Sequence, residues 1–317
     1  MANMTAAAGR RRKEGYWGRL LKSLNRTKYL QLLLLPGLIY YIIFQYVPMY
    51  GVIIAFKDYK IREGILGSDW VGLQHFKDFF NYMYSGRIIR NTVLLNLYNL
   101  IFGFPMPIIF AILLNEVRNL RYKKFVQTIS YMPHFISTVS IVGILTMILS
   151  PTNGIVNVLI SKLGGTPIYF MTRTEWFRTI YVASGVWQDV GWDAIIYIAA
   201  LASVNQELYE AAVIDGASRL KQIWHVSLPG IRSTIVIMLI MRMGGMMSSN
   251  TDKVLLMQNE LTYEVSDIIG TYVYRRGIRD ADYSYSTAVG LFNSLINVIF
   301  VVAANTIAKR LGESSLW

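Results

Sequence analysis

The feature that most constrains this chain is a set of long apolar runs. A helix that crosses a bilayer needs about 20 mostly apolar residues. Charged residues make up only 16% of the chain, against about 25% in soluble domains. The sequence therefore predicts an all-α membrane protein with six transmembrane helices. The six runs lie at residues 30–56, 92–114, 125–149, 179–203, 231–247 and 288–308.

Basic residues cluster in alternate connections between these runs. Lys and Arg collect in cytoplasmic loops and set the orientation of a membrane protein. Both termini are therefore predicted to be cytoplasmic, and most of the net charge of +12 has a topological cause instead of a nucleic-acid partner. The chain then divides into a basic cytoplasmic segment at 1–28, a transmembrane domain at 29–310 and a cytoplasmic tail at 311–317.

The connection at residues 206–230 differs from its surroundings. It reads QELYEAAVIDGASRLKQIWHVSLPG and is too polar to span a membrane. Good helix formers extend to Ala217, and Gly216 allows a sharp turn because it has no Cβ. A second short helix is expected at 219–226, and Pro229 fits the first turn of the next span. Spacing alone leaves two interpretations open, a knob that docks into a cytoplasmic partner and an ordinary helical connection.

The order of residues in this loop resembles the EAA signature of permease subunits of binding-protein-dependent ABC importers. Gly occupies the seventh place and Leu-Pro the nineteenth and twentieth, while Val226 replaces the usual isoleucine. The resemblance implies a coupling helix that docks into an ATPase subunit through an acidic residue. The coupling residues that it implies are Glu210, Ala211, Ala212, Asp215, Gly216, Ala217, Leu228 and Pro229.

The resemblance covers most of the chain. Segments such as SYMPHFIS, SPTNGIVN and GVWQDVGWDAIIYIAALASVNQELYEAAVIDGA are similar to the carbohydrate branch of this family, nearest the permeases for alginate-type and other oligo- or polysaccharides. This similarity implies a type I ABC importer permease fold, a bacterial cell membrane and a saccharide substrate. It also implies a second homologous permease in a heterodimer, two ATP-binding cassette subunits and an extracytoplasmic solute-binding protein.

The chain lacks a G-x-x-x-x-G-K-[ST] stretch that could cradle ATP phosphates. We therefore expect ATP and Mg to bind the partner ATPase. No catalytic residue, metal or cofactor is expected in this chain.

Ionisable residues inside the spans are functional candidates, because a charge in lipid is costly unless it is paired or hydrated. Asp189 and Asp193 lie one helical turn apart in the fourth run, and Arg242 lies in the fifth. Asp193 and Arg242 are each about ten residues from the cytoplasmic end of their helix, which at ~1.5 Å per residue predicts an ion pair near mid-membrane. Such a pair either fixes the register of two helices or lines the translocation path.

Sugar sites combine aromatic faces with amides and carboxylates. Further candidates for the translocation path are Trp187, Gln188, Trp192, Asn96, Asn293 and Asn297. Asn side chains also join helices by hydrogen bonds, so both roles stay open for them. His75, His134 and His225 lie in different regions and are assigned no role. The aromatic residues of the two long outer loops either anchor the chain at the interface or contact a binding protein.

Three other functions remain as alternatives. A permease of the same class could carry a non-sugar solute. An ion-coupled secondary transporter is disfavoured, because no inverted repeat is evident and six spans are few for that class. A membrane-embedded enzyme would need convergent carboxylates or metal ligands, and the sequence offers none.

Overall fold

The computed structural model describes residues 27–317. The predicted basic segment at 1–28 lies outside the described residues except for Thr27 and Lys28. The chain divides into two compact units, Met1–Ile53 and Ile54–Trp317, and each is described by itself.

The described part of the first unit is one helical run. It consists of α2 (Lys28–Tyr41), the π-helical turn η1 (Ile42–Tyr46), α3 (Val47–Met49) and the beginning of η2 (Tyr50–Phe56). Pro36 lies inside α2 and Pro48 inside α3. Proline cannot donate to the helical hydrogen-bond ladder, and membrane helices absorb this loss by local π or 3₁₀ adjustments. The π-helical turn lies between the two prolines and shows this adjustment.

The second unit is helical apart from one antiparallel pair of two-residue strands, β1 (Lys57–Asp58) and β2 (Asp69–Trp70). Its α-helices are α4 (Gly64–Gly67), α5 (Gln74–Asn81), α6 (Ser85–Tyr98), α7 (Pro105–Asn115), α8 (Leu120–Tyr131), α9 (Thr138–Ile148), α10 (Ile155–Lys162), α11 (Thr174–Ala202), α12 (Gln206–Ile214), α13 (Arg219–Gln222), α14 (Leu228–Gly230), α15 (Arg232–Met243), α16 (Thr251–Met257), α17 (Tyr263–Ser266), α18 (Ile269–Tyr274) and α19 (Tyr283–Arg310). Shorter π or 3₁₀ turns are η3 (Asn99–Gly103), η4 (Met132–Phe135), η5 (Ile223–Ser227), η6 (Glu260–Thr262) and η7 (Arg275–Arg279).

Three helical runs within residues 27–317 are long and apolar enough to cross a membrane, namely Lys28–Phe56, Ser85–Asn115 and Tyr283–Arg310. The number rises to five if each of two bent helix pairs forms one span. The predicted fourth span falls in α11, which has 29 residues but is not among these five because it is less apolar. Six spans therefore stay a prediction.

The bend of the first pair falls inside the predicted span at 125–149, whereas the bend of the second pair lies at the beginning of the predicted span at 231–247, whose helix α15 ends at Met243. The first pair turns by 101° between Leu120–Phe135 and Thr138–Ile148, directly after the turn η4, which contains Pro133. The second turns by 62° between Arg219–Gly230 and Arg232–Met243. Pro229 therefore belongs to the short helix α14 and not to the first turn of the next span.

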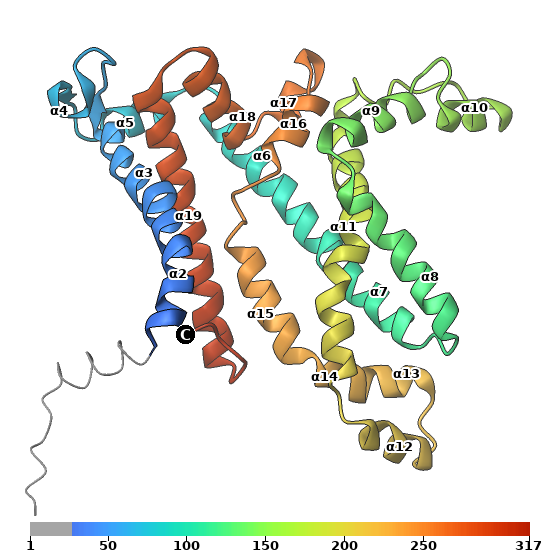
Figure 1. The fold of residues 1–317 in the computed structure, drawn as a ribbon. Helices are drawn as coiled ribbons and strands as arrows, with labels where there is room; N and C mark the ends of the chain where they lie inside the picture. Colours follow the sequence, from blue (N-terminus) through green and yellow to red (C-terminus); the bar gives the residue numbers. More distant parts are fainter. Residues whose placement is uncertain (1–26) are drawn as a thin grey trace, which may run out of the picture. The chain divides into compact units, whose positions relative to one another are not determined.

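Helix α11 is the central element of the second unit. It packs against α7 and α8, with the loop of α12 and α13 at one end and α9, α10 and α16 to α18 toward the other (Figure 1). A Cβ atom at Gly191 of α11 would overlap the backbone carbonyl of Ser130, and small residues allow such close approach of helices. Three buried apolar clusters hold α11, α19 and their neighbours together.

Candidate functional site

The loop at 206–230 folds as a helical hairpin whose second arm, Arg219–Gly230, is the first half of the second bent pair. The Asn205 side chain caps α12 by accepting a hydrogen bond from the backbone N–H of Glu207, at 3.0 Å. Gly216 ends this helix with a φ of 75°, a left-handed conformation that glycine adopts readily. The predicted turn at Gly216 is confirmed. The Tyr209 hydroxyl lies 2.9 Å from the Ser227 hydroxyl and joins α12 to the turn η5.

The outer face of this hairpin is unoccupied in the chain by itself. None of the residues of α12 is buried, and Glu210 is exposed with no ion pair among the described residues. The large apolar side chains of Ile214, Leu220 and Trp224 are also exposed. Exposed apolar clusters with polar neighbours mark interaction surfaces. Most of the predicted coupling residues are exposed, whereas Ala212 and Ala217 are half-buried and Leu228 packs against a buried apolar cluster.

One ion pair joins the hairpin to the rest of the unit, and a second joins the helix that follows it. Arg219 of α13 lies 3.6 Å from Glu116, the residue that caps the end of α7. Arg232, at the start of α15, forms an ion pair with Glu313 in the tail. The hairpin is thus in direct contact with the end of α7, and the start of α15 with the tail that follows α19.

That tail folds back on α19. The Asn305 side chain accepts a hydrogen bond from the Leu316 N–H at 2.7 Å and donates one to the Trp317 carbonyl at 3.4 Å. Asn305 is buried, so both groups of its amide need partners inside the protein. The tail supplies them.

A small polar cavity lies between α11, the turn η3, α15 and α16. Its volume is about 70 Å³, and its lining includes three predicted path residues on α11 together with Arg242. The predicted residues that it brings together are Gln188, Asp189, Asp193 and Arg242. Asn99, Asn250 and Lys253 add three further polar side chains.

The predicted ion pair between Asp193 and Arg242 is not present. Both side chains line the cavity, yet no contact within 4.0 Å joins them among the described ion pairs. Asp189 pairs instead with His134, whose Nδ1 lies 2.9 Å from the carboxylate. His134 was given no role from the sequence, and it holds one of the two carboxylates of the fourth span.

The bend of the third span brings His134 to this position. Its ring stacks on Trp192 with centroids 4.6 Å apart and planes 4° apart. Gln188 donates a hydrogen bond to the Ile136 carbonyl at 3.3 Å. Trp192 and Gln188 therefore join α11 to the bend, while Trp187 lies in an apolar groove formed mainly with α9.

The three predicted Asn residues lie apart from this cavity. Asn96 donates to the Ser249 hydroxyl at 2.8 Å, and Asn297 accepts from the Met247 N–H at 2.7 Å. Both join a helix to the segment that follows α15, the structural role that was left open for them. Asn293 differs, because its buried side-chain oxygen has no hydrogen-bond partner among the described residues.

Lys253 is a site residue that the sequence did not indicate. It lies in α16, outside the predicted spans, and only 3% of it is exposed. Its ammonium lies 5.3 Å from the centre of the Tyr181 ring. Burial lowers the pKa of this ammonium to about 8, and the Asp189 carboxylate opposes part of the shift. A charged lysine in a loop with many other charges gave no signal that it would be buried.

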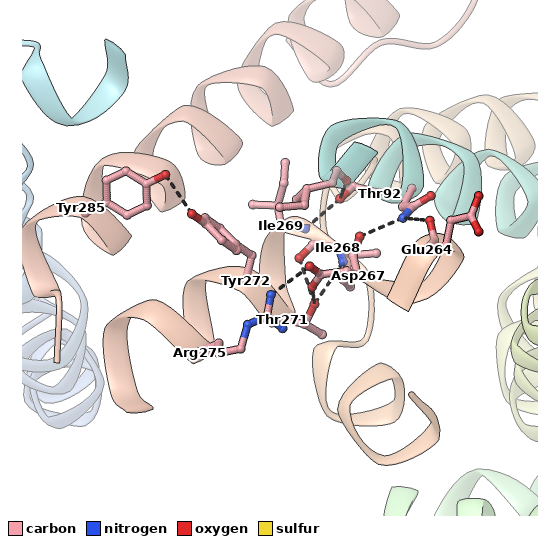
Figure 2. Close-up of polar contacts among 11 residues, drawn as sticks. Thr92, Glu264, Asp267, Ile268, Ile269, Thr271, Tyr272, Arg275 and Tyr285 are labelled. Atoms are coloured by element: carbon pink, nitrogen blue, oxygen red, sulfur yellow. Dashed lines mark hydrogen bonds and ion pairs between the residues drawn. The ribbon is translucent and has the colours of Figure 1, made fainter. Parts of the chain in front are cut away.

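The segment at 260–275 is fixed to α6. Figure 2 shows the Ile269 N–H donating to the Thr92 hydroxyl, at 2.9 Å. Asn91 donates to the carbonyls of Glu264 and Asp267, at 2.9 and 3.1 Å. Backbone groups of this segment are therefore satisfied by two side chains on a predicted span.

A second set of contacts closes the same segment on itself and on α19. Arg275 donates to the Asp267 carboxylate at 2.8 Å, and Thr271 donates to its other oxygen at 2.9 Å (Figure 2). The hydroxyls of Tyr272 and Tyr285 lie 2.9 Å apart, and both rings are buried. These two tyrosines belong to the core, which corrects the expectation that they anchor at the interface or contact a binding protein.

The sequence matches a known protein family over most of the second unit. Residues 79–313 match the family described as "Binding-protein-dependent transport system inner membrane component". Protein LplB of Bacillus subtilis is 47% identical over 297 residues, which cover 94% of this chain and 93% of the relative. The polygalacturonan/rhamnogalacturonan transport system permease protein YteP of the same organism is 46% identical, with the same coverage.

Solved structures of a bacterial alginate ABC transporter contain a similar chain. One, in complex with an alginate pentasaccharide-bound periplasmic protein, aligns with a TM-score of 0.87 at 40% identity. The alignment covers 94% of this chain and 100% of that chain. A second, described as involved in import of the acidic polysaccharide alginate, has a TM-score of 0.85 at 41% identity and covers 92% and 99% of the two chains.

These matches confirm the helical permease fold and the predicted family. The chain belongs to the inner-membrane components of binding-protein-dependent transport systems.

Proposed function

We propose that this chain is the permease subunit of an ATP-driven importer for an oligo- or polysaccharide. It has six transmembrane helices with both termini cytoplasmic, and it forms half of the translocation path. The names of two similar proteins support a saccharide, since one transports polygalacturonan and rhamnogalacturonan and the other belongs to an alginate transporter.

Membership of this family of transport-system components also implies the partners of the chain. A second homologous permease completes the path, two ATP-binding cassette subunits hydrolyse ATP with Mg, and a solute-binding protein delivers the saccharide from outside. The chain itself is non-catalytic. The solved alginate transporter in complex with its periplasmic protein supports the last of these partners.

The observation that carries this proposal is the exposed hairpin at 206–230. The Glu210 carboxylate has no ion pair among the described residues, and large apolar side chains of the same hairpin are exposed. A charged hydrogen bond from an arginine of the ATPase would satisfy the carboxylate, while the apolar side chains would become buried. Closing of the ATPases would then move the hairpin as a rigid body, and the ion pairs of Arg219 and Arg232 would pass this movement to α7 and to the tail.

The path is the finer part of the proposal. Asp189, Asp193, Arg242 and Gln188 converge on one polar cavity, which supports their assignment to the path. Asn293, with an unpartnered buried oxygen, stays a candidate. Trp187, Trp192, Asn96 and Asn297 make contacts that join elements, and for them we propose positioning of the path.

Reconstitution tests the proposal. The chain is co-expressed with its neighbouring permease and ATP-binding subunits, purified and placed in proteoliposomes with the binding protein. We expect uptake of labelled oligosaccharide that requires both ATP and the binding protein. Uptake that persists without the ATP-binding subunits would contradict an ATP-driven importer and favour secondary transport.

A further inference from the structure

Lys253 carries a buried positive charge that the protein does not neutralise by contact. Its ammonium makes no hydrogen bond or ion pair with any residue in the range 27–317, and its described contact is the face of the Tyr181 ring. A Cβ at Gly185 of α11 would lie 3.7 Å from the same nitrogen. Because Gly185 and Tyr181 both line the polar cavity, the ammonium is placed at the cavity wall.

The other charged groups around this cavity are also incompletely paired. Asp189 is held by His134, whereas Asp193 and Arg242 have no ion pair among the described residues. Arg242 lies near η3, where a Cβ at Gly103 would be 3.8 Å from its Nη2. Two cations therefore line one cavity without a protein carboxylate within 4.0 Å of either.

Charged side chains that line a cavity without an ion-pair partner need a partner that is not part of the chain. Burying a charge without a compensating interaction is strongly unfavourable, and ionisable residues in membrane proteins face water or a substrate path. A cavity needs roughly 10–15 Å³ to hold one water, so about 70 Å³ accommodates several. It is smaller than typical ligand sites of ~300–1,000 Å³. The cavity is thus large enough for water but too small for a saccharide, which would fit only if the elements around it separated.

We propose that Lys253 and Arg242 bind the carboxylate of a sugar acid in the translocation path, and that Lys253 determines preference for acidic over neutral saccharides. This inference rests on the proposed function. Arginine binds a carboxylate through two parallel hydrogen bonds, and lysine adds a compact point charge. Asn99, Asn250 and Gln188 at the same cavity supply amides suited to sugar hydroxyls.

The location of Lys253 suits selection at the outer end of the path. Helix α16 belongs to the segment between α15 and α19, and its start is tied to α11 by a hydrogen bond from the Asn250 N–H to the Tyr181 hydroxyl, at 3.1 Å. The ammonium lies against Tyr181, in the half of α11 remote from the hairpin, which follows Ala202. A sugar acid delivered from outside would therefore meet Lys253 on its way inward.

The test compares two variants in the reconstituted complex with its binding protein. Lys253→Met keeps the length of the side chain without the charge, and Lys253→Arg keeps the charge. Lys162→Met, on the exposed surface of α10, controls for loss of a lysine elsewhere. The probes are labelled tetragalacturonate and the neutral galactotetraose, and size-exclusion chromatography confirms that each variant assembles.

We expect the wild-type complex to import tetragalacturonate in preference to galactotetraose. Lys253→Met should lower tetragalacturonate uptake at least tenfold, while Lys253→Arg and Lys162→Met keep at least half of it. Normal tetragalacturonate uptake by assembled Lys253→Met would overturn the role of Lys253. Wild-type import of galactotetraose but not tetragalacturonate would overturn the carboxylate site and leave a saccharide importer. Import of neither probe would contradict the proposed saccharide function and this inference with it.

Discussion

Residues at three positions determine how closely two helices approach and which charged groups line the polar cavity. Gly191 lets α11 meet the backbone of α8. His134 holds Asp189, and Lys253 brings an unpaired ammonium to the cavity. Two of these positions lead to quantitative expectations.

Replacing Gly191 by alanine should destabilise the protein. The new methyl group would overlap the Ser130 carbonyl, and relieving such overlap by backbone shifts costs about 1–3 kcal/mol. Gly290→Ala is the matched control, because a Cβ there meets nothing within 4 Å. Thermal unfolding of the detergent-purified complex measures both. Equal melting temperatures for the two variants would show that α11 and α8 do not pack this tightly.

Uptake of an acidic oligosaccharide should fall in alkaline buffer. With a pKa of about 8 for Lys253, the charged form predominates at pH 7 and falls roughly tenfold by pH 9. The cation that binds the carboxylate is therefore lost as the pH rises. The variant Lys253→Arg keeps its charge over this pH range. It retains the other titratable groups around the cavity, namely Asp189, Asp193, Arg242, His134 and Tyr181. The uptake rate of Lys253→Arg divided by that of wild type therefore reports the titration of Lys253 alone.

We expect this ratio to rise between pH 7 and pH 9 for tetragalacturonate. Initial uptake rates into proteoliposomes at matched ATP hydrolysis provide the measurement. A ratio that stays constant over this range would mean that the charge of Lys253 does not limit uptake.

Within the second unit, ion pairs join the exposed hairpin to α7 and the helix that follows it, α15, to the tail after α19. Arg219 joins α13 to the end of α7, and Arg232 joins the start of α15 to Glu313 of the tail. Asn305 in turn fixes the tail to α19. Polar contacts therefore run from α13 to the end of α7, and from the start of α15 through the tail to α19.

Reversing the charge of Glu116 should impair the coupling of ATP hydrolysis to transport more than it lowers the stability of the fold. An exposed pair such as Glu116 with Arg219 contributes only about 0–1 kcal/mol to stability. We expect Glu116→Arg to lower the number of sugars imported per ATP by about threefold, the factor that corresponds to ~0.6 kcal/mol. Uptake and phosphate release are measured together.

The double variant Glu116→Arg with Arg219→Glu restores the attraction in reversed order. It should recover most of the coupling that either single variant loses. If the double variant were as impaired as the single ones, the contact would not transmit movement between α13 and α7.

Across the whole molecule, some features could be predicted from the sequence and others could not. Gly216 was predictable as a turn, because a left-handed residue after a helix favours glycine. The bend that follows Pro133 was not predictable from the proline itself. Pro36 and Pro107 lie inside helices that continue past them. Proline removes one hydrogen bond wherever it occurs, and only the surrounding packing decides whether the helix bends.

The convergence of residues on one cavity was predicted better than the pairs that they form. Counting residues from the helix ends placed Asp193 and Arg242 at similar depth, and both line one cavity. Pairing also depends on the direction in which each side chain points around its helix, which depth does not determine. The approach of His134 and Lys253 comes from a bend and from a short helix, neither of which the hydropathy of the chain indicates.

The central claim is that a saccharide permease is driven by an ATPase through the hairpin that carries Glu210. Its most direct test is ATP-dependent uptake by the reconstituted complex with Glu210→Arg, beside Glu207→Arg as a control in the same exposed helix. We predict normal membrane insertion for both variants, at least a tenfold loss of uptake for Glu210→Arg because its docking charge is reversed, and near-normal uptake for Glu207→Arg. Normal uptake by Glu210→Arg would contradict the account.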